Sequence, residues 1–104
     1  MNMAKVIISS EAVNDLHKAN AYIRDELCDP DAAKRILGKL RKSIVALQTM
    51  PERGTSLDSV ISVHTEFRFL VCERYRIFYL VNGDTVEIVR ILHTLQNYMN
   101  VLFE

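Results

Sequence analysis

The side chains that could do chemistry in this 104-residue sequence are concentrated in its C-terminal third. Four arginines and one histidine lie within or beside three apolar, β-branched stretches: Arg68, Arg74, Arg76, Arg90 and His93. An arginine in a central strand buries its aliphatic stem, while its guanidinium needs either an acidic partner or an open sheet face. On an open face, such a group would bind an anion such as phosphate. His93 could move a proton there, because imidazole titrates near neutral pH.

A structural role is the competing interpretation of these cations. Three glutamates could neutralise the arginines as ordinary cross-strand pairs: Glu66, Glu73 and Glu87. A second group of cations lies on the polar face of a predicted helix: Lys34, Arg35, Lys39, Arg41 and Lys42. This group is either a solvated helix face or a surface that attracts an anionic partner.

Several other kinds of site are disfavoured. The histidines and the two cysteines lack the paired spacing of metal ligands, and three glycines are too few for a nucleophile elbow with an oxyanion loop. The 13 basic and 13 acidic residues give a net charge of +0, which disfavours a non-specific nucleic-acid coat. No apolar run approaches the roughly 20 residues that span a bilayer. We therefore expect a cytoplasmic protein with no cofactor, no metal and no membrane contact.

The elements that must position these residues follow from periodicity and punctuation. Length and composition predict a single domain over residues 1–104. A β-branched strand at 5–8 precedes a helix over 10–28, and Pro30 begins a second helix antiparallel to the first. Residues 57–65 read as a loop. Strands are then predicted at 67–72, 75–81 and 85–92, followed by a short apolar tail at 98–103.

The Asn82-Gly83 dipeptide predicts a two-residue hairpin turn between the last two strands. With Val81 and Asp84 flanking the turn, the predicted cross-strand pairs are Tyr79–Val86, Ile77–Ile88 and Tyr75–Arg90. One face, with Ile77, Tyr79, Val86 and Ile88, would lie under the helices. The other would be open and carry Arg74, Arg76, Phe78, Val89, Ile91 and His93. The predicted fold class is α+β, in the order β-α-α-β-β-β, with two helices on one face of an antiparallel sheet.

Five motifs give the sequence a resemblance to a known family. They are F-R-F-L-V (67–71), Y-R-I-F-Y-L-V (75–81), the N-G-D turn (82–84), V-E-I-V-R-I-L-H (86–93) and N-Y-M-N-V-L-F (97–103). Together they resemble the RelE/ParE toxins of type II toxin–antitoxin modules. The leading strand, the helix pair and the M-P-E-R-G turn (50–54) also match. The resemblance therefore covers essentially the whole chain and implies a β-α-α-β-β-β(-α) fold and a cognate antitoxin partner.

The resemblance also implies an activity. One branch of the family cuts mRNA in the ribosomal A site without a metal, and the other poisons DNA gyrase. We expect a ribosome-dependent mRNA endonuclease; the alternatives are a gyrase poison or a degenerate domain that retains only antitoxin binding. By motif, the catalytic residues would be Arg76, His93 and Tyr98, and phosphate would be bound by Arg68, Arg90 and Arg53. Candidates for the general base are Glu52, His64 and Glu66.

The sequence departs from the family pattern directly after His93. Many relatives carry one or two basic residues there, whereas this chain has Leu95 and Gln96. The neutral overall charge is a second departure, because ribosome-dependent toxins are commonly basic. Both departures weaken the expected contacts with RNA and leave antitoxin binding unaffected.

Overall fold

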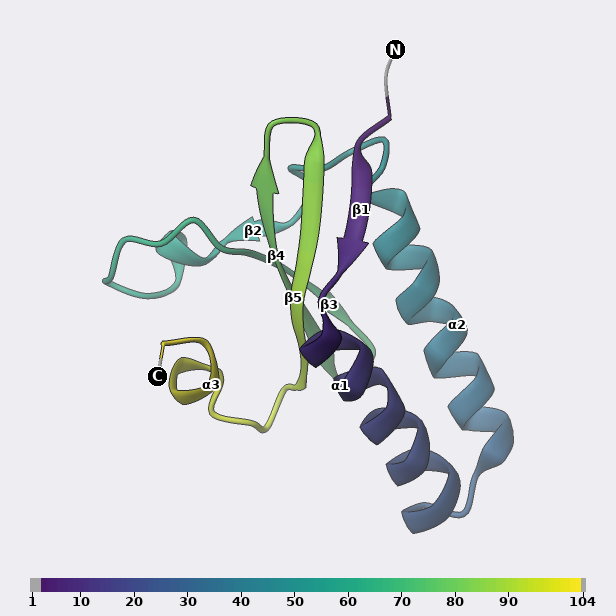
Figure 1. Cartoon of the computed structure of the whole chain (residues 1–104). Coiled ribbons are helices and arrows are strands. Elements are labelled where there is room, and N and C mark those ends of the chain that lie inside the picture. The colour runs from purple at the N-terminus through teal and green to yellow at the C-terminus, as the bar shows by residue number, and fades with distance from the viewer. Residues whose placement is uncertain (1–2, 104) are drawn as a thin grey trace.

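A computed structural model describes residues 3–103 as a five-stranded sheet with two long helices on one face and a short helix on the other (Figure 1). The elements in chain order are β1 (Lys5–Ile8), α1 (Ser10–Ala21), the π-helical η1 (Tyr22–Glu26), α2 (Pro30–Ala46), β2 (Thr55–Ser56), the 3-10 turn η2 (Leu57–Ser59), β3 (Arg68–Cys72), β4 (Tyr75–Asn82), β5 (Thr85–His93) and α3 (Tyr98–Phe103). The strand order in the sheet is β1-β5-β4-β3-β2.

Side-chain caps set the starts of the two long helices. The Ser9 hydroxyl accepts the N–H of Ala12 at the start of α1. At the start of α2, the carboxylate of Asp29, the residue before Pro30, accepts the N–H of Ala32. The first helix continues from α1 through η1, so it ends near residue 26 and not at 28. Both predicted helices are confirmed, and their apolar stripes pack on the sheet through Ala12, Ala19, Ile23, Ala33, Leu40, Ile44 and Leu47.

The sheet is mixed, so the expectation of an antiparallel sheet is wrong for one strand pair. Strand β1 runs parallel to β5, with Val6 opposite Val86 and Ile8 opposite Ile88. The helix pair carries the chain from β1, at one edge, to β2 at the other edge. The remaining pairs are antiparallel, and the short strand β2 was not predicted.

The predicted hairpin exists, but its register is wrong. Asn82 pairs with Thr85, so the turn residues are Gly83 and Asp84, and Gly83 takes a positive φ of 62°. Glycine at the first turn position is typical of a type II′ turn, which moves the pairing by two residues relative to our prediction. A shift of two preserves the faces. Ile77, Tyr79, Val86 and Ile88 are therefore all buried under the helices, as expected.

A β-bulge then changes the faces in the second half of β5. Tyr79 pairs with Ile88 whereas Phe78 pairs with Arg90, so Val89 is an extra residue. One extra residue reverses the alternation of every side chain that follows it. Ile91 accordingly lies in the core under the helices, and His93 follows it to that face. The prediction that these two residues share the face of Arg76 is wrong.

The opposite face of the sheet is also less open than expected. Leu57, Phe78 and Leu92 form a second buried cluster. The residues that cover it come from the loop after η2, from β3 and from α3: Ile61, Phe67, Phe69, Tyr98, Val101 and Leu102. Figure 1 shows α3 on the side of the sheet away from α1 and α2. The sheet therefore separates two apolar layers of unequal size.

Candidate functional site

Arg76 and Tyr98 come together on the α3 face of the sheet. The Arg76 guanidinium carbon lies 5.3 Å from the centre of the Tyr98 ring, which itself stacks on Phe78 with ring centres 5.2 Å apart. Arg76 also donates from Nη1 to the carbonyl oxygen of Thr94 at 3.1 Å. Within residues 3–103, no carboxylate forms an ion pair with Arg76. Its charge is therefore held by a carbonyl and an aromatic face.

His93 lies on the other face, under the helices. It pairs with Tyr75 on the neighbouring strand β4, and the two ring centres lie 5.4 Å apart in an edge-to-face arrangement. Its Nδ1 accepts the N–H of Leu95 at 3.1 Å, so a neutral ring carries its proton on Nε2. The structure thus brings two of the three expected catalytic residues, Arg76 and Tyr98, together and places the third, His93, on the opposite face of the sheet.

Arg90 is engaged by an aspartate that our sequence interpretation missed. Asp15 on α1 receives Nε and Nη2 of Arg90 at 2.8 and 2.9 Å, and its Oδ2 also accepts the N–H of Ile91 at 2.9 Å. The hydrogen bonds and the negative charge raise the pKa of Arg90. Beyond Ile8, β1 no longer covers the edge of β5, so this carboxylate replaces a strand partner. The available signal was an acid within the apolar stripe of α1, between Ala12 and Ala19.

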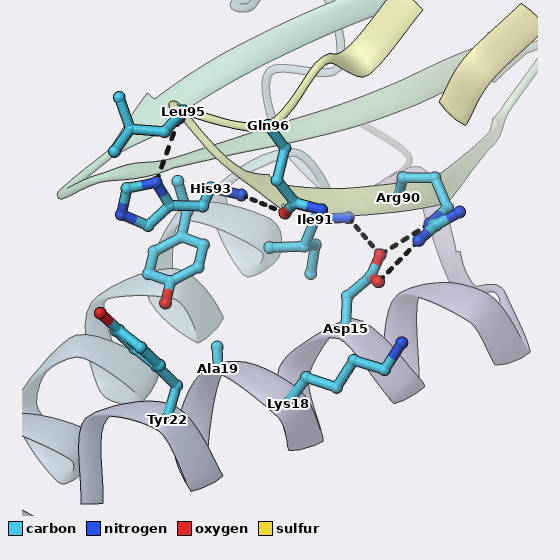
Figure 2. Close-up of a pocket in the computed structure, with 10 residues that line it drawn as sticks. Asp15, Lys18, Ala19, Tyr22, Arg90, Ile91, His93, Leu95 and Gln96 are labelled. Carbon is cyan, nitrogen blue, oxygen red and sulfur yellow. Dashed lines mark hydrogen bonds and ion pairs between the residues drawn. The ribbon is translucent and has the colours of Figure 1, made fainter. Parts of the chain in front are cut away.

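A cavity of about 370 Å³ lies between α1 and the end of β5, and we call it the α1–β5 pocket (Figure 2). Its lining residues are Asp15, Lys18, Ala19, Tyr22, Tyr75, Arg90, Ile91, His93, Leu95 and Gln96. Burial and the nearby Tyr22 phenol raise the pKa of Tyr75, which therefore stays protonated at neutral pH. Figure 2 shows the phenol of Tyr22 at one end of this cavity and Lys18 at the other.

Arg68 and Arg53, the other expected phosphate ligands, lie around the turn that follows α2. Arg68 donates from Nη1 to the carbonyl oxygens of Gly54 at 2.9 Å and Glu52 at 3.3 Å. The Tyr79 hydroxyl accepts the N–H of Gly54 at 2.9 Å, and burial raises the pKa of this phenol. Arg68 therefore anchors the turn, while Arg53 is exposed beside a shallow cavity of about 440 Å³.

The loop between η2 and β3 holds two of the candidate bases. His64 Nδ1 lies 2.7 Å from Asp58, and its Nε2 lies 3.5 Å from Glu66. Hydrogen bonds from the N–H and hydroxyl of Thr65, together with His64, hold the pKa of Asp58 below its ordinary value. His64 is thus tied to its own loop.

The basic face of α2 is partly neutralised. Arg35 Nη1 and Lys39 Nζ both bind Glu73 Oε1, at 3.1 and 2.9 Å, and these contacts lower the pKa of Glu73. The alternative in which Glu73 pairs with a strand arginine is therefore wrong. Lys34, Arg41 and Lys42 have no ion pair within the described part of the chain.

Residues 3–103 contain neither a cluster of metal ligands nor a membrane-spanning helix. No group of three or more histidine, cysteine, aspartate or glutamate side chains is arranged to hold a metal ion. No helix in that range has the length and apolarity needed to cross a membrane.

Comparisons with known proteins agree with this architecture. The family model described as ParE toxin of type II toxin–antitoxin system, parDE, matches residues 6–98. The solved chromosomal ParDE system from P. aeruginosa is similar with a TM-score of 0.70 and 19% identity, covering 88% of this chain and 96% of that chain. The RelBE2 toxin–antitoxin complex from Mycobacterium tuberculosis gives a TM-score of 0.63 and 22% identity, covering 89% and 93%. A search of curated proteins finds no match.

The solved structures support the fold alone, because they are only 19% and 22% identical to this chain. The family model goes further, because its match begins in β1 and ends at the first residue of α3. Both faces of the sheet and both long helices lie within the matched range. The chain belongs to the ParE toxin family of type II toxin–antitoxin systems.

Proposed function

We propose that this toxin acts by binding DNA gyrase and trapping it on DNA, and that a cognate antitoxin neutralises it. The observation that carries this proposal is the separation of Arg76 and Tyr98 from His93 by the sheet. The match to the ParE model supports the same activity, as does the likeness to a ParDE system. This choice reverses the order of the two activities that the sequence resemblance implied.

Cleavage of RNA through the ribose 2′-OH requires three groups around one phosphodiester linkage, and the positions of Arg76 and His93 oppose such an arrangement. A base must reach the 2′-OH, an acid the leaving 5′ oxygen and a cation the phosphate of the same linkage, each within hydrogen-bonding distance of its own atom. Here Arg76 contacts Thr94 and Tyr98 on the α3 side, whereas His93 contacts Tyr75 and Leu95 on the helix side. Arg76 on β4 and His93 on β5 extend from opposite faces of the sheet, which opposes contact of both side chains with one phosphate.

The remaining candidate cations add to this support. Arg68 and Arg90 are already bound by the carbonyls of the 52–54 turn and by Asp15. Nη1 of Arg68 and the Nε–Nη2 edge of Arg90 are already occupied, so each guanidinium offers fewer donors to a phosphate. A toxin that works through surface contacts with a protein target does not need these groups to be free.

The test compares gyrase poisoning with mRNA cleavage in the same set of proteins. Purified toxin is mixed with gyrase, ATP and supercoiled plasmid, and linear DNA is measured after denaturation of the enzyme. In cells, a DNA-damage reporter and mapping of mRNA 5′ ends follow induction of the wild type, Arg76→Ala and His93→Ala. We expect trapped gyrase–DNA complexes, reporter induction and no A-site cuts, with growth arrest retained in any variant whose circular dichroism shows a native fold.

Two results would contradict the proposal. Cuts in the ribosomal A site that disappear in the folded Arg76→Ala variant would establish the nuclease reading. Unimpaired growth on induction of the wild type without its antitoxin would establish a domain that retains antitoxin binding alone.

A further inference from the structure

We propose that the α1–β5 pocket is a binding site for a carboxylate carried on an apolar or aromatic body. The proposal does not depend on the identity of the toxin's target. The cavity volume of about 370 Å³ lies near the lower end of the range for small-ligand sites, roughly 300–1,000 Å³. A ligand or side chain of about ten heavy atoms is therefore the appropriate size.

The charges that line the pocket leave one cation without a partner. Asp15 and Arg90 form a bidentate pair, and Oδ2 of Asp15 also accepts the N–H of Ile91. Lys18, by contrast, forms no ion pair with any residue between 3 and 103. Figure 2 shows its ammonium group on the same side of the pocket as Asp15 and Arg90. Among the lining residues, Lys18 is therefore the cation without an ion pair in residues 3–103, while Glu11, whose charge acts on Arg90, lies outside the lining.

The other polar groups of the lining are mostly hydrogen-bond donors. With Nδ1 of His93 occupied by Leu95, the neutral ring presents an N–H at Nε2. Tyr22 and Tyr75 each add a hydroxyl, while the Gln96 side-chain oxygen is occupied by the N–H of His93. A lining rich in donors, whose one carboxylate already accepts three hydrogen bonds, selects a ligand that accepts hydrogen bonds and carries negative charge.

The apolar part of the pocket decides between a carboxylate and a phosphate. Ala19 and Ile91 lie between the phenolic and the cationic ends, and both are buried residues of the core. A dianionic phosphate would have one unpaired cation and apolar walls around it. The hydration free energy that it loses would exceed the interaction free energy that it gains in this pocket. A monoanion attached to an apolar group fits better, because its single charge matches Lys18 and its apolar part can pack on Ala19 and Ile91.

Leu95 extends the apolar surface at the rim of the pocket. Its side chain is 87% exposed, the most exposed of the large apolar residues described. Three hydrogen bonds fix the turn that carries it: Leu95 N–H to His93 Nδ1, Gln96 N–H to the His93 carbonyl, and His93 N–H to Gln96 Oε1. A rigid turn that holds a leucine in water is suited to contact the body of a bound ligand.

The carboxylate can come from a free carboxylic acid or from an acidic residue beside an apolar one in a partner protein. The experiment uses the ¹⁵N-labelled full-length chain, titrated separately with 3-phenylpropionate, with the peptide acetyl-Phe-Asp-amide and with neutral 3-phenylpropionamide. We expect at least one of the two acids to shift the amide signals of Ala19, Ile91 and Leu95, with a Kd of about 1 mM or below. Tighter binding of the peptide points to a partner protein, and tighter binding of the free acid points to a small molecule; either supports the site.

Two substitutions test the charge argument. Lys18→Gln should weaken binding of the acid by about fivefold or more, whereas Lys42→Gln, which removes an exposed charge on α2 outside the lining, should leave binding unchanged. The proposal is overturned if neither acid shifts these signals at about 10 mM, if the amide binds as tightly as the acid, or if Lys18→Gln binds like the wild type.

Discussion

The bidentate contact between Asp15 and Arg90 makes a sharp prediction, because the chain contains a matched exposed counterpart. Arg24 and Asp25 form the same pair of hydrogen bonds, at 2.8 and 3.0 Å, but their side chains are 50% and 59% exposed. In the inner pair, the Asp15 side chain is 6% exposed and that of Arg90 is 25% exposed. The two pairs therefore differ in burial, and in the extra N–H that Asp15 accepts from Ile91.

Asp15→Ala should lower the free energy of unfolding by about 2–4 kcal/mol. Loss of the acceptor for the buried Ile91 N–H costs about 1–3 kcal/mol, and the rest comes from leaving Arg90 without its counter-ion. The total stays below the roughly 3–5 kcal/mol of a fully buried broken pair, because Arg90 retains some contact with water. For a chain of this length the midpoint of thermal unfolding should fall by about 10–25 °C.

Denaturant and thermal unfolding of a small set of variants would check this estimate. Asp15→Asn keeps an oxygen for the Ile91 N–H but loses the charge, so it should cost less than Asp15→Ala. The double variant Asp15→Ala/Arg90→Ala should be less destabilised than the sum of its single variants, by about 1–2 kcal/mol. Asp25→Ala should be indistinguishable from the wild type. If Asp15→Ala were no more destabilising than Asp25→Ala, the assignment of this carboxylate as the closure of the β5 edge would be wrong.

Three further predictions concern the rest of the fold. Gly54→Ala should destabilise the protein by about 1–3 kcal/mol, because its Cβ would lie 2.5 Å from the Tyr79 hydroxyl. Gly38→Ala, with open space around it in α2, should instead stabilise the protein by about 0.5–1 kcal/mol. Equal effects of the two substitutions in denaturant unfolding would contradict the steric argument. Tyr79→Phe should cost about 1–3 kcal/mol, because the buried Gly54 N–H loses its acceptor, and the same unfolding curves would reveal a cost near zero if water replaced it. The hydrogen bonds from Thr65 hold the pKa of Asp58 below its ordinary value of 3.8, so the stability difference between wild type and Asp58→Asn should be present above that pH and disappear as the pH falls through the lowered pKa; a difference that grows on acidification would refute it.

The bulge at Val89 marks the limit of what the sequence could predict about the site. Strand and helix positions follow from periodicity, and the face with Ile77 and Val86 was predicted correctly even though the hairpin register was off by two. A bulge carries no reliable signal in composition, yet it reverses every later side chain. Sequence patterns alone therefore placed His93 beside Arg76 when the two occupy opposite faces.

Other features escaped prediction for different physical reasons. Tyr98 contacts Arg76 because α3 folds back over Phe78. The apolar character of the tail predicts that it packs against the sheet, but it does not predict where on the sheet. Asp15 was overlooked because a carboxylate in an apolar stripe is interpreted as exposed unless its partner is known. The partner, Arg90, is 75 residues away in the sequence.

The pairing of β1 with β5 determines when during synthesis this protein can become a toxin. The first strand binds residues 85–88, and the Ser9 hydroxyl reaches a carbonyl 80 residues further along the chain. Contacts of such long sequence separation form late, and during translation β1 has no partner until β5 has emerged from the ribosome. The pairing of β1 therefore has to wait until residues 85–88 have been synthesised. A chain that stops before β5 lacks the strand that pairs with β1 and cannot form this part of the sheet.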